Sequence, residues 1–150
     1  SQKYKLYIGE KTAEQAKIEL ANVFDPTGEK KITVKGRHLI KGLPVSQEIT
    51  DADISQAIKE LIDELIDGIK KVFEKTPPEL VGDIKQNGIV LTGGGAMLGG
   101  LDRLVSRETG VPCFVAEEPL KCVAKGTAAA FGLSEELLDG FERISLYRYK

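Results

Sequence analysis

The residues best suited by type and spacing to chemistry are a run of three glycines in the second half of the chain. Gly93, Gly94 and Gly95 follow an apolar run at 89–92 that predicts a strand, and they precede an amphipathic stretch that predicts a helix. Glycine lacks a Cβ atom, so the backbone of such a loop can approach a planar or anionic ligand closely. Amides at the start of the following helix would point into the same space. The run predicts either a ligand-binding loop or a tight turn that holds no ligand.

Two phosphate-binding motifs can be tested against this loop by counting. The dinucleotide motif G-x-G-x-x-G, started at Gly93, requires glycine at position 98, where the chain has Leu98. A Walker A loop started at Gly94 or Gly95 lacks the Lys and the Ser or Thr that must follow. Both motifs are absent, so the glycines alone do not decide between the two interpretations.

Few other side chains are able to bind or react. Glu14 and Lys17 lie three positions apart on an expected helix, a spacing typical of a solvated ion pair. His38 is the only histidine and has no second metal ligand near it in sequence. Cys113 and Cys122 lack the C-x-x-C spacing of a metal or redox site. We expect a surface histidine, two free thiols in apolar surroundings, and no catalytic or metal site in this chain.

The first predicted elements are a helix and a small antiparallel sheet. Thr12 and Gln15 form a capping-box pattern, which predicts a helix over about 13–24. Alternation of polar and apolar residues at 31–36, together with 48–50, predicts two or three short antiparallel strands.

The longest predicted element is the helix that follows. Thr50 and Asp53 form a second capping-box pattern, and apolar residues then recur at helical spacing to about Lys75. Asp51 and Asp53 are interpreted as residues that interact with the helix dipole, not as a catalytic pair.

The last third of the chain predicts a strand–helix–strand unit with parallel strands, the first of them covered on both faces. The elements expected there are a short helix at 78–86, a strand at 89–92, the glycine loop, a helix that carries Met97 or Leu98, Leu101, Leu104 and Val105 and stops at Gly110, a buried strand at 113–115, and a helix from Pro119 to Gly132.

The length and the charge of the chain limit the classes of protein to which it can belong. A chain of 150 residues can bury one ordinary core or two small lobes. With 21 Lys and Arg against 23 Asp and Glu it has no net basic field, so we expect no nucleic-acid partner. No apolar run approaches the roughly 20 residues that cross a bilayer, and we expect a soluble, cytoplasmic protein. The start at Ser1 suggests a piece of a longer protein.

Several segments resemble, in the same order, segments of the MreB-type bacterial actins. They are I-G-E-K-T-A-E-Q-A-K-I-E at 8–19, V-K-G-R-H-L-I-K-G-L-P at 34–44, T-P-P-E-L at 76–80, and G-I-V-L-T-G-G-G-A at 88–96 followed by G-L-D-R-L at 100–104. The collinear matches cover about 8–131.

That family is similar to actin, Hsp70 and sugar kinases, in which two lobes of RNase-H-like α/β fold close over ATP and magnesium. The resemblance implies that this chain is an incomplete second lobe, subdomains IIA and IIB. Its larger, nucleotide-facing subdomain would comprise 1–24 and 77–132, with a βαβ unit. A small α+β outer subdomain would comprise 25–76, and a C-terminal helix and tail 133–150.

The resemblance also implies a cofactor site. Its residues would be Glu14 and Lys17, which match contacts to adenine and ribose, and Gly93, Gly94, Gly95, Ala96 and Met97, which match the loop behind the adenosine moiety. The family's phosphate-binding hairpins, its magnesium-positioning acid and its water-orienting group lie upstream of this segment. ATP or ADP with Mg²⁺ is therefore expected in the complete protein, and this chain alone is expected not to hydrolyse ATP.

The partners implied by the resemblance are other filament subunits, the missing N-terminal lobe and the machinery of cell shape and cell-wall synthesis. Contact with the inner face of the membrane would be indirect, through the missing lobe. Candidate filament contacts are the helix at 51–75 and the loop at 37–44, and the strand at 88–92 would have an unpaired edge. Two alternatives stay open: another ATPase of the superfamily, such as a sugar kinase or a chaperone-like protein, or a protein-interaction module without nucleotide.

Overall fold

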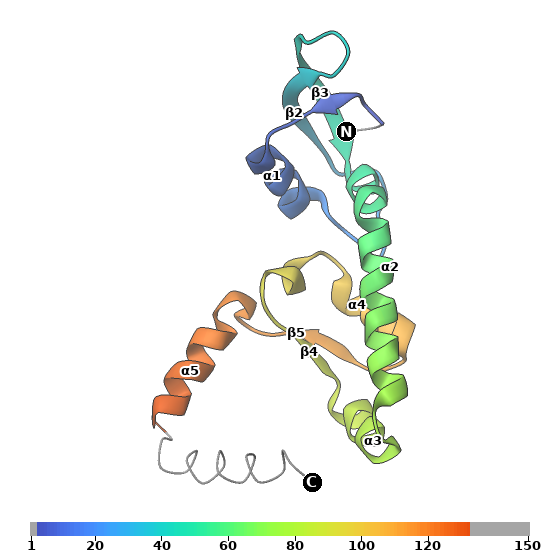
Figure 1. Ribbon diagram of the computed structural model, residues 1–150, viewed down its shortest axis with the longest axis vertical. Coiled ribbons are helices and arrows are strands. Elements are labelled where there is room, and N and C mark those ends of the chain that lie inside the picture. The colour runs from blue at the N-terminus through green and yellow to red at the C-terminus, as the bar shows by residue number, and fades with distance from the viewer. Residues whose placement is uncertain (1–2, 133–150) are drawn as a thin grey trace.

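The computed structural model describes residues 3–132 (Figure 1), so the predicted C-terminal helix and tail at 133–150 lie outside the described residues. Its elements, in chain order, are β1 (Leu6–Tyr7), α1 (Glu10–Leu20), β2 (Lys31–His38), β3 (Pro44–Thr50), α2 (Asp51–Lys75), α3 (Pro78–Asn87), β4 (Ile89–Leu91), the 3₁₀ helix η1 (Gly94–Met97), α4 (Leu101–Thr109), β5 (Cys113–Val115), the 3₁₀ helix η2 (Pro119–Lys121) and α5 (Cys122–Gly132).

Helix α2 runs along the long axis of the molecule, with one small sheet at its N-terminal end and the other beside its C-terminal half (Figure 1). One sheet is antiparallel with strand order β1-β2-β3, and Ile32 lies opposite Ile49 in its register. The other sheet pairs β4 with β5 in parallel, Val90 opposite Phe114. The predictions of a small antiparallel sheet and of a parallel strand pair are confirmed.

Each sheet has its own apolar core. The first combines Leu6 of β1, Ala16 and Leu20 of α1, Val34 of β2 and Ile49 of β3. Ala16 and Leu20 are four residues apart, so they lie on the same face of α1, and that face is the one turned to the sheet. This core lies at the N-terminal half of α2.

The second core lies at the C-terminal half of α2. It combines Ile66 of α2, Leu101, Leu104 and Val105 of α4, and Cys113 of β5. Leu101, Leu104 and Val105 recur at i, i+3 and i+4, which places them on one stripe of α4. The bounds of the predicted subdomains stay a prediction, because two cores along a shared helix do not by themselves define subdomains.

The start of α2 is confirmed in detail. The backbone amide of Asp53 donates to the Thr50 hydroxyl at 3.2 Å, and the amide of Thr50 donates to the Asp53 carboxylate at 3.0 Å. This reciprocal capping box satisfies two amides that have no partner within the helix. Helix α2 ends at Lys75 and α3 begins at Pro78, as the Thr76-Pro77-Pro78 sequence predicts.

The prediction for α1 is wrong at both ends. The helix begins at Glu10 after Gly9, whose carbonyl accepts from the Ala13 amide at 3.0 Å, and no side chain caps it. Gln15 donates instead to Glu19 at 2.8 Å. The helix ends at Leu20, not near residue 24, because the residues after it form a turn organised by Asn22.

The prediction for the segment after the glycines is also wrong. Gly94–Met97 form a single 3₁₀ turn, and α4 begins only at Leu101 after Gly100, whose φ of +76° favours glycine. Amides of this segment form hydrogen bonds within the turn: Ala96 donates to the Gly93 carbonyl, and Leu98 donates to the Gly95 carbonyl. The start of a long helix therefore does not point into the loop.

Burial of the parallel strands differs from the expectation as well. Val90 is 61% exposed and Phe114 is 54% exposed, so neither strand is covered on both faces. Among residues 3–132, β4 pairs with β5 alone. None of the described helices is both long enough and apolar enough to span a bilayer.

Candidate functional site

The glycine loop presents backbone to open space. A Cβ atom built on Gly93 or Gly95 would meet nothing within 4 Å, and one on Gly94 would touch only the Leu120 side chain, at 3.6 Å. Gly93 has a φ of +80°, where other residues are strained. Its amide donates to the Pro119 carbonyl at 2.8 Å, which holds the start of the loop against η2.

The last two predicted loop residues differ from each other in exposure. Ala96 is buried at 4% exposure and anchors the 3₁₀ turn, whereas Met97 is 61% exposed. A flexible, apolar side chain beside bare backbone is well suited to contact a flat ring. Of the five loop residues, Ala96 therefore supports the shape of the loop, and the others are accessible to a ligand.

Glu14 and Lys17 form an ion pair on the surface of α1. The Lys17 Nζ atom lies 2.7 Å from Glu14 Oε2, and the two side chains are 47% and 58% exposed. An exposed pair at this spacing stabilises a helix by only about 0.2–0.5 kcal/mol. Both groups are consequently free to exchange this contact for hydrogen bonds to a ligand at little cost in stability.

The structure links the two predicted segments through one backbone bridge. Asn22, just after α1, forms a parallel bridge with Gly99, just after η1, and the Val23 amide donates to the Gly99 carbonyl at 2.8 Å. In Figure 1 α1 and the loop before α4 lie on the same side of α2. A shallow hollow beside Glu14 is lined by α1 residues alone, and the glycine loop contributes nothing to it.

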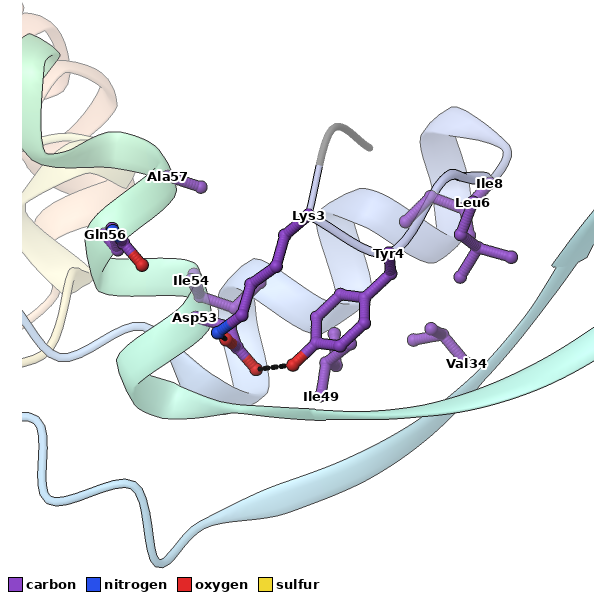
Figure 2. Close-up of a pocket in the computed structure, with 10 residues that line it drawn as sticks. All are labelled: Lys3, Tyr4, Leu6, Ile8, Val34, Ile49, Asp53, Ile54, Gln56 and Ala57. Carbon is purple, nitrogen blue, oxygen red and sulfur yellow. Dashed lines mark hydrogen bonds and ion pairs between the residues drawn. The ribbon is translucent and has the colours of Figure 1, made fainter. Parts of the chain in front are cut away.

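A larger hollow, of about 650 Å³, lies elsewhere, between β1, the first core and the start of α2 (Figure 2). At its rim the Asp53 carboxylate accepts from the Tyr4 hydroxyl at 2.8 Å and pairs with the Lys3 ammonium. Burial alone would raise the pKa of Asp53, but hydrogen bonds from Lys3, Thr50 and Tyr4 outweigh it and hold that pKa far below its usual range. Asp53, the N3 residue of the capping box, is therefore ionised at neutral pH.

Sequence reasoning missed Lys3 and Tyr4 as partners of Asp53. They precede it by 50 and 49 positions, and no local spacing signals a contact over that separation. The contact depends on the pairing of β1 with β2, which brings the N-terminal segment beside the start of α2.

The histidine and the two cysteines are the remaining reactive side chains, and their contacts are with neighbouring parts of the fold. The Nδ1 atom of His38 accepts from the amides of Ile40 and Lys41, both at 3.2 Å, so this half-buried histidine shapes the β2–β3 turn. Cys113 and Cys122 are free thiols, as predicted, and burial raises the pKa of Cys113. Within residues 3–132 no three His, Cys, Asp or Glu side chains are grouped to hold a metal ion.

Comparison with known proteins agrees with the resemblance of the segments. The family model described as MreB/Mbl protein matches residues 1–138. The chain is 42% identical over 134 residues to the cell shape-determining protein Mbl of Bacillus subtilis (strain 168), covering 89% of the chain and 40% of Mbl. It is 42% identical over 127 residues to the cell shape-determining protein MreB of Escherichia coli (strain K12), covering 85% of the chain and 37% of MreB. The chain thus spans about two fifths of the length of these relatives.

Solved structures show the same fold. The crystal structure of MreB5 of Spiroplasma citri bound to ADP superposes with a TM-score of 0.85 at 30% identity, covering 92% of this chain and 42% of MreB5. The MamK double helical filament gives a TM-score of 0.61 at 23% identity, over 77% of this chain and 35% of MamK, which shows a shared fold alone. The predicted actin-like α/β fold, present in part, is confirmed. From the match of the family model and the level of identity we conclude that the chain belongs to the MreB/Mbl family.

Proposed function

We propose that this chain is the second-lobe part of an actin-like cytoskeletal protein that binds ATP and forms filaments directing cell shape and cell-wall synthesis. Relatives at 42% identity are named cell shape-determining proteins, and solved MreB5 structures are bound to AMPPNP and ADP. The observation that carries the proposal is the open backbone of Gly93 and Gly95, tied by the Asn22–Gly99 bridge to the end of α1.

The geometry suits the adenosine part of a nucleotide. A purine needs a flat, close wall with a few dipoles, which the bare backbone at Gly93–Gly95 supplies. Glu14 would accept from a ribose hydroxyl, and Lys17 would donate to a ring or ribose acceptor. Ala96 would hold the turn, and Met97 would contact the edge of the base.

Hydrolysis requires more than this chain provides. Phosphoryl transfer depends on a metal ion, a phosphate clamp and an oriented water acting together. We assign Mg²⁺ and the phosphates to the upstream lobe, so the chain alone is predicted to be inactive. The two subdomains, 1–24 with 77–132 and 25–76, belong to the same proposal.

The exposed apolar surfaces of the chain indicate the partners that it would bind. The exposed Val90 and Phe114, which lie opposite each other in the β4–β5 pair, form an apolar region suited to the missing lobe, beside the edge of β4 that no strand of residues 3–132 covers. Further copies of the protein would complete a filament, placed in the cytoplasm at the inner face of the membrane through the missing lobe.

The proposal is tested by titrating ADP with Mg²⁺ into the protein that joins this chain to its upstream segment. Glu14→Ala and Lys17→Ala should each weaken ADP binding about tenfold, in line with charged hydrogen bonds worth about 1.5–3 kcal/mol. Lys31→Ala, which breaks a similarly exposed ion pair with Glu48 on the antiparallel sheet, is the matched control and should leave the affinity unchanged. Absence of ADP binding by the unaltered protein, or equal affinities for all variants, would overturn the proposal.

A further inference from the structure

Three separate segments meet behind the proposed adenosine site, at a cluster here called the Asn22 junction: Asn22, Ser55 and Gly99. The Ser55 hydroxyl on α2 lies 2.5 Å from the Asn22 carbonyl oxygen, to which it donates, and 2.8 Å from the Asp51 carbonyl oxygen. The next residue, Val23, donates its amide to Gly99 at 2.8 Å. The end of α1, the end of the glycine segment and α2 are thereby fastened at one point.

The Asn22 side chain fixes the shape of the turn at this point. Its Oδ1 atom accepts from the Phe24 amide at 3.2 Å and from the Asp25 amide at 3.4 Å, and its Nδ2 atom donates to the Asp25 carbonyl at 3.0 Å. The Phe24 ring is covered by the guanidinium groups of Arg103 and Arg107, 4.7 Å and 5.2 Å from its centre. The turn is consequently locked onto α4 as well.

The contact between the segments leaves no room for a side chain. A Cβ atom on Gly99 would lie 2.6 Å from the Ala21 carbonyl oxygen, a backbone atom that cannot rotate away. One on Gly100 would lie 2.7 Å from Phe24 Cβ and 2.9 Å from Asn22 Oδ1. The spacing between the α1 end and the glycine segment is therefore set by the absence of side chains at Gly99 and Gly100.

We propose that Asn22, Ser55 and Gly99 are positioning residues for the nucleotide, which set the distance between the Glu14–Lys17 pair and the glycine loop. This inference rests on the proposed function. Gly99 lies two residues after Met97, and Asn22 lies five residues after Lys17. A shift at the junction is transmitted directly to both walls of the site, although none of the three residues needs to touch the ligand.

The direct test is Gly99→Ala in the protein that includes the upstream lobe. The added methyl group must push the two segments apart. A displacement of binding groups by about 1 Å is able to lower affinity tenfold or more. We expect the ATP concentration for half-maximal hydrolysis to rise about tenfold while kcat stays within about twofold, because the phosphates are held elsewhere. The matched control is Gly82→Ala on α3, where a Cβ would meet nothing within 4 Å.

Two less disruptive variants, at Ser55, test the inference if Gly99→Ala does not fold. Ser55→Ala removes the hydroxyl bond to Asn22 and should weaken ADP binding about threefold, and Ser55→Thr, which keeps the hydroxyl, should restore it. Parental ADP affinity in both Gly99→Ala and Ser55→Ala would overturn the inference, as would equal losses in Ser55→Ala and Ser55→Thr. If the unaltered protein binds no ADP, it is the proposed function that fails, so the two failures are distinguishable.

Discussion

Asp53 is the residue at which the N-terminal segment, the antiparallel sheet and α2 are joined. Its carboxylate accepts from Thr50, Tyr4 and Lys3, and its side chain is only 9% exposed. Because these bonds favour the ionised form, the pKa of Asp53 lies below the value of about 3.9 expected in an unfolded chain. The stabilisation is therefore fully present above about pH 4 and is lost as the pH falls further.

We predict that Asp53→Ala lowers the free energy of unfolding of this chain at pH 7 by about 1 kcal/mol, the usual cost of a lost helix cap. The difference from the unaltered chain should shrink between pH 4 and pH 2, measured by urea denaturation at each pH. Asp63→Ala is the control on the same helix, because Asp63 is 60% exposed and its one ion pair within residues 3–132 is with Lys59. An unchanged difference across that pH range would contradict the role assigned to Asp53.

At the scale of elements, β1 is a two-residue strand that depends on one glycine in β2. A Cβ atom on Gly36 would overlap the Tyr7 carbonyl oxygen and lie 2.9 Å from Leu6 Cδ1. Gly36→Ala should therefore force β1 away from β2 and lower the free energy of unfolding by about 1–3 kcal/mol. Gly68→Ala on α2, with open space at its Cβ, should not destabilise the chain. Equal unfolding midpoints in urea for the two variants would exclude this contact as the reason for a glycine at 36.

Elements with a strong local signal were predictable, and those set by distant contacts were not. The α2 helix carries its cap, its apolar period and its proline stop in its own sequence. The end of α1 is fixed by Asn22 and Gly99, which are 77 positions apart, so continued helical spacing to Phe24 gave the wrong boundary. At the site, the glycine run was a candidate from the sequence alone, but its ligand was indicated only by the family resemblance. Glu14 and Lys17 were named only from that resemblance, because a solvated ion pair on a helix looks ordinary alone.

At the scale of the whole molecule, one edge of β4 pairs with no strand of residues 3–132, and this edge and the exposed side chains beside it predict association of the isolated chain. Unpaired strand edges with apolar side chains are templates for pairing with another chain. The average mass from light scattering should rise with concentration, and Val90→Lys should reduce the rise. Val72→Lys is the control, since Val72 is equally apolar and is 65% exposed on α2. A folded monomer at every concentration would contradict the prediction.

The tip of the β2–β3 hairpin lies at one end of the long axis (Figure 1) and presents Leu39, Ile40 and Leu43, which are 51%, 70% and 62% exposed. The turn is held in shape, because His38 donates its amide to Leu43 and accepts from the Gly42 amide, both at 2.9 Å. A preformed apolar tip at one end of an elongated molecule suits a head-to-tail contact, which extends into a filament when it does not close into a ring.

In the protein with its upstream lobe, Ile40→Asp should therefore raise the concentration needed for sedimentable filaments several-fold, since it places a charge in that contact. ADP affinity should be unchanged, because the tip is remote from the glycine loop. Leu61→Asp makes the same change at a side chain that is 67% exposed on α2, the other candidate filament surface. Loss of filaments in Leu61→Asp but not in Ile40→Asp would place the contact along α2, and the tip would then be a solvated turn.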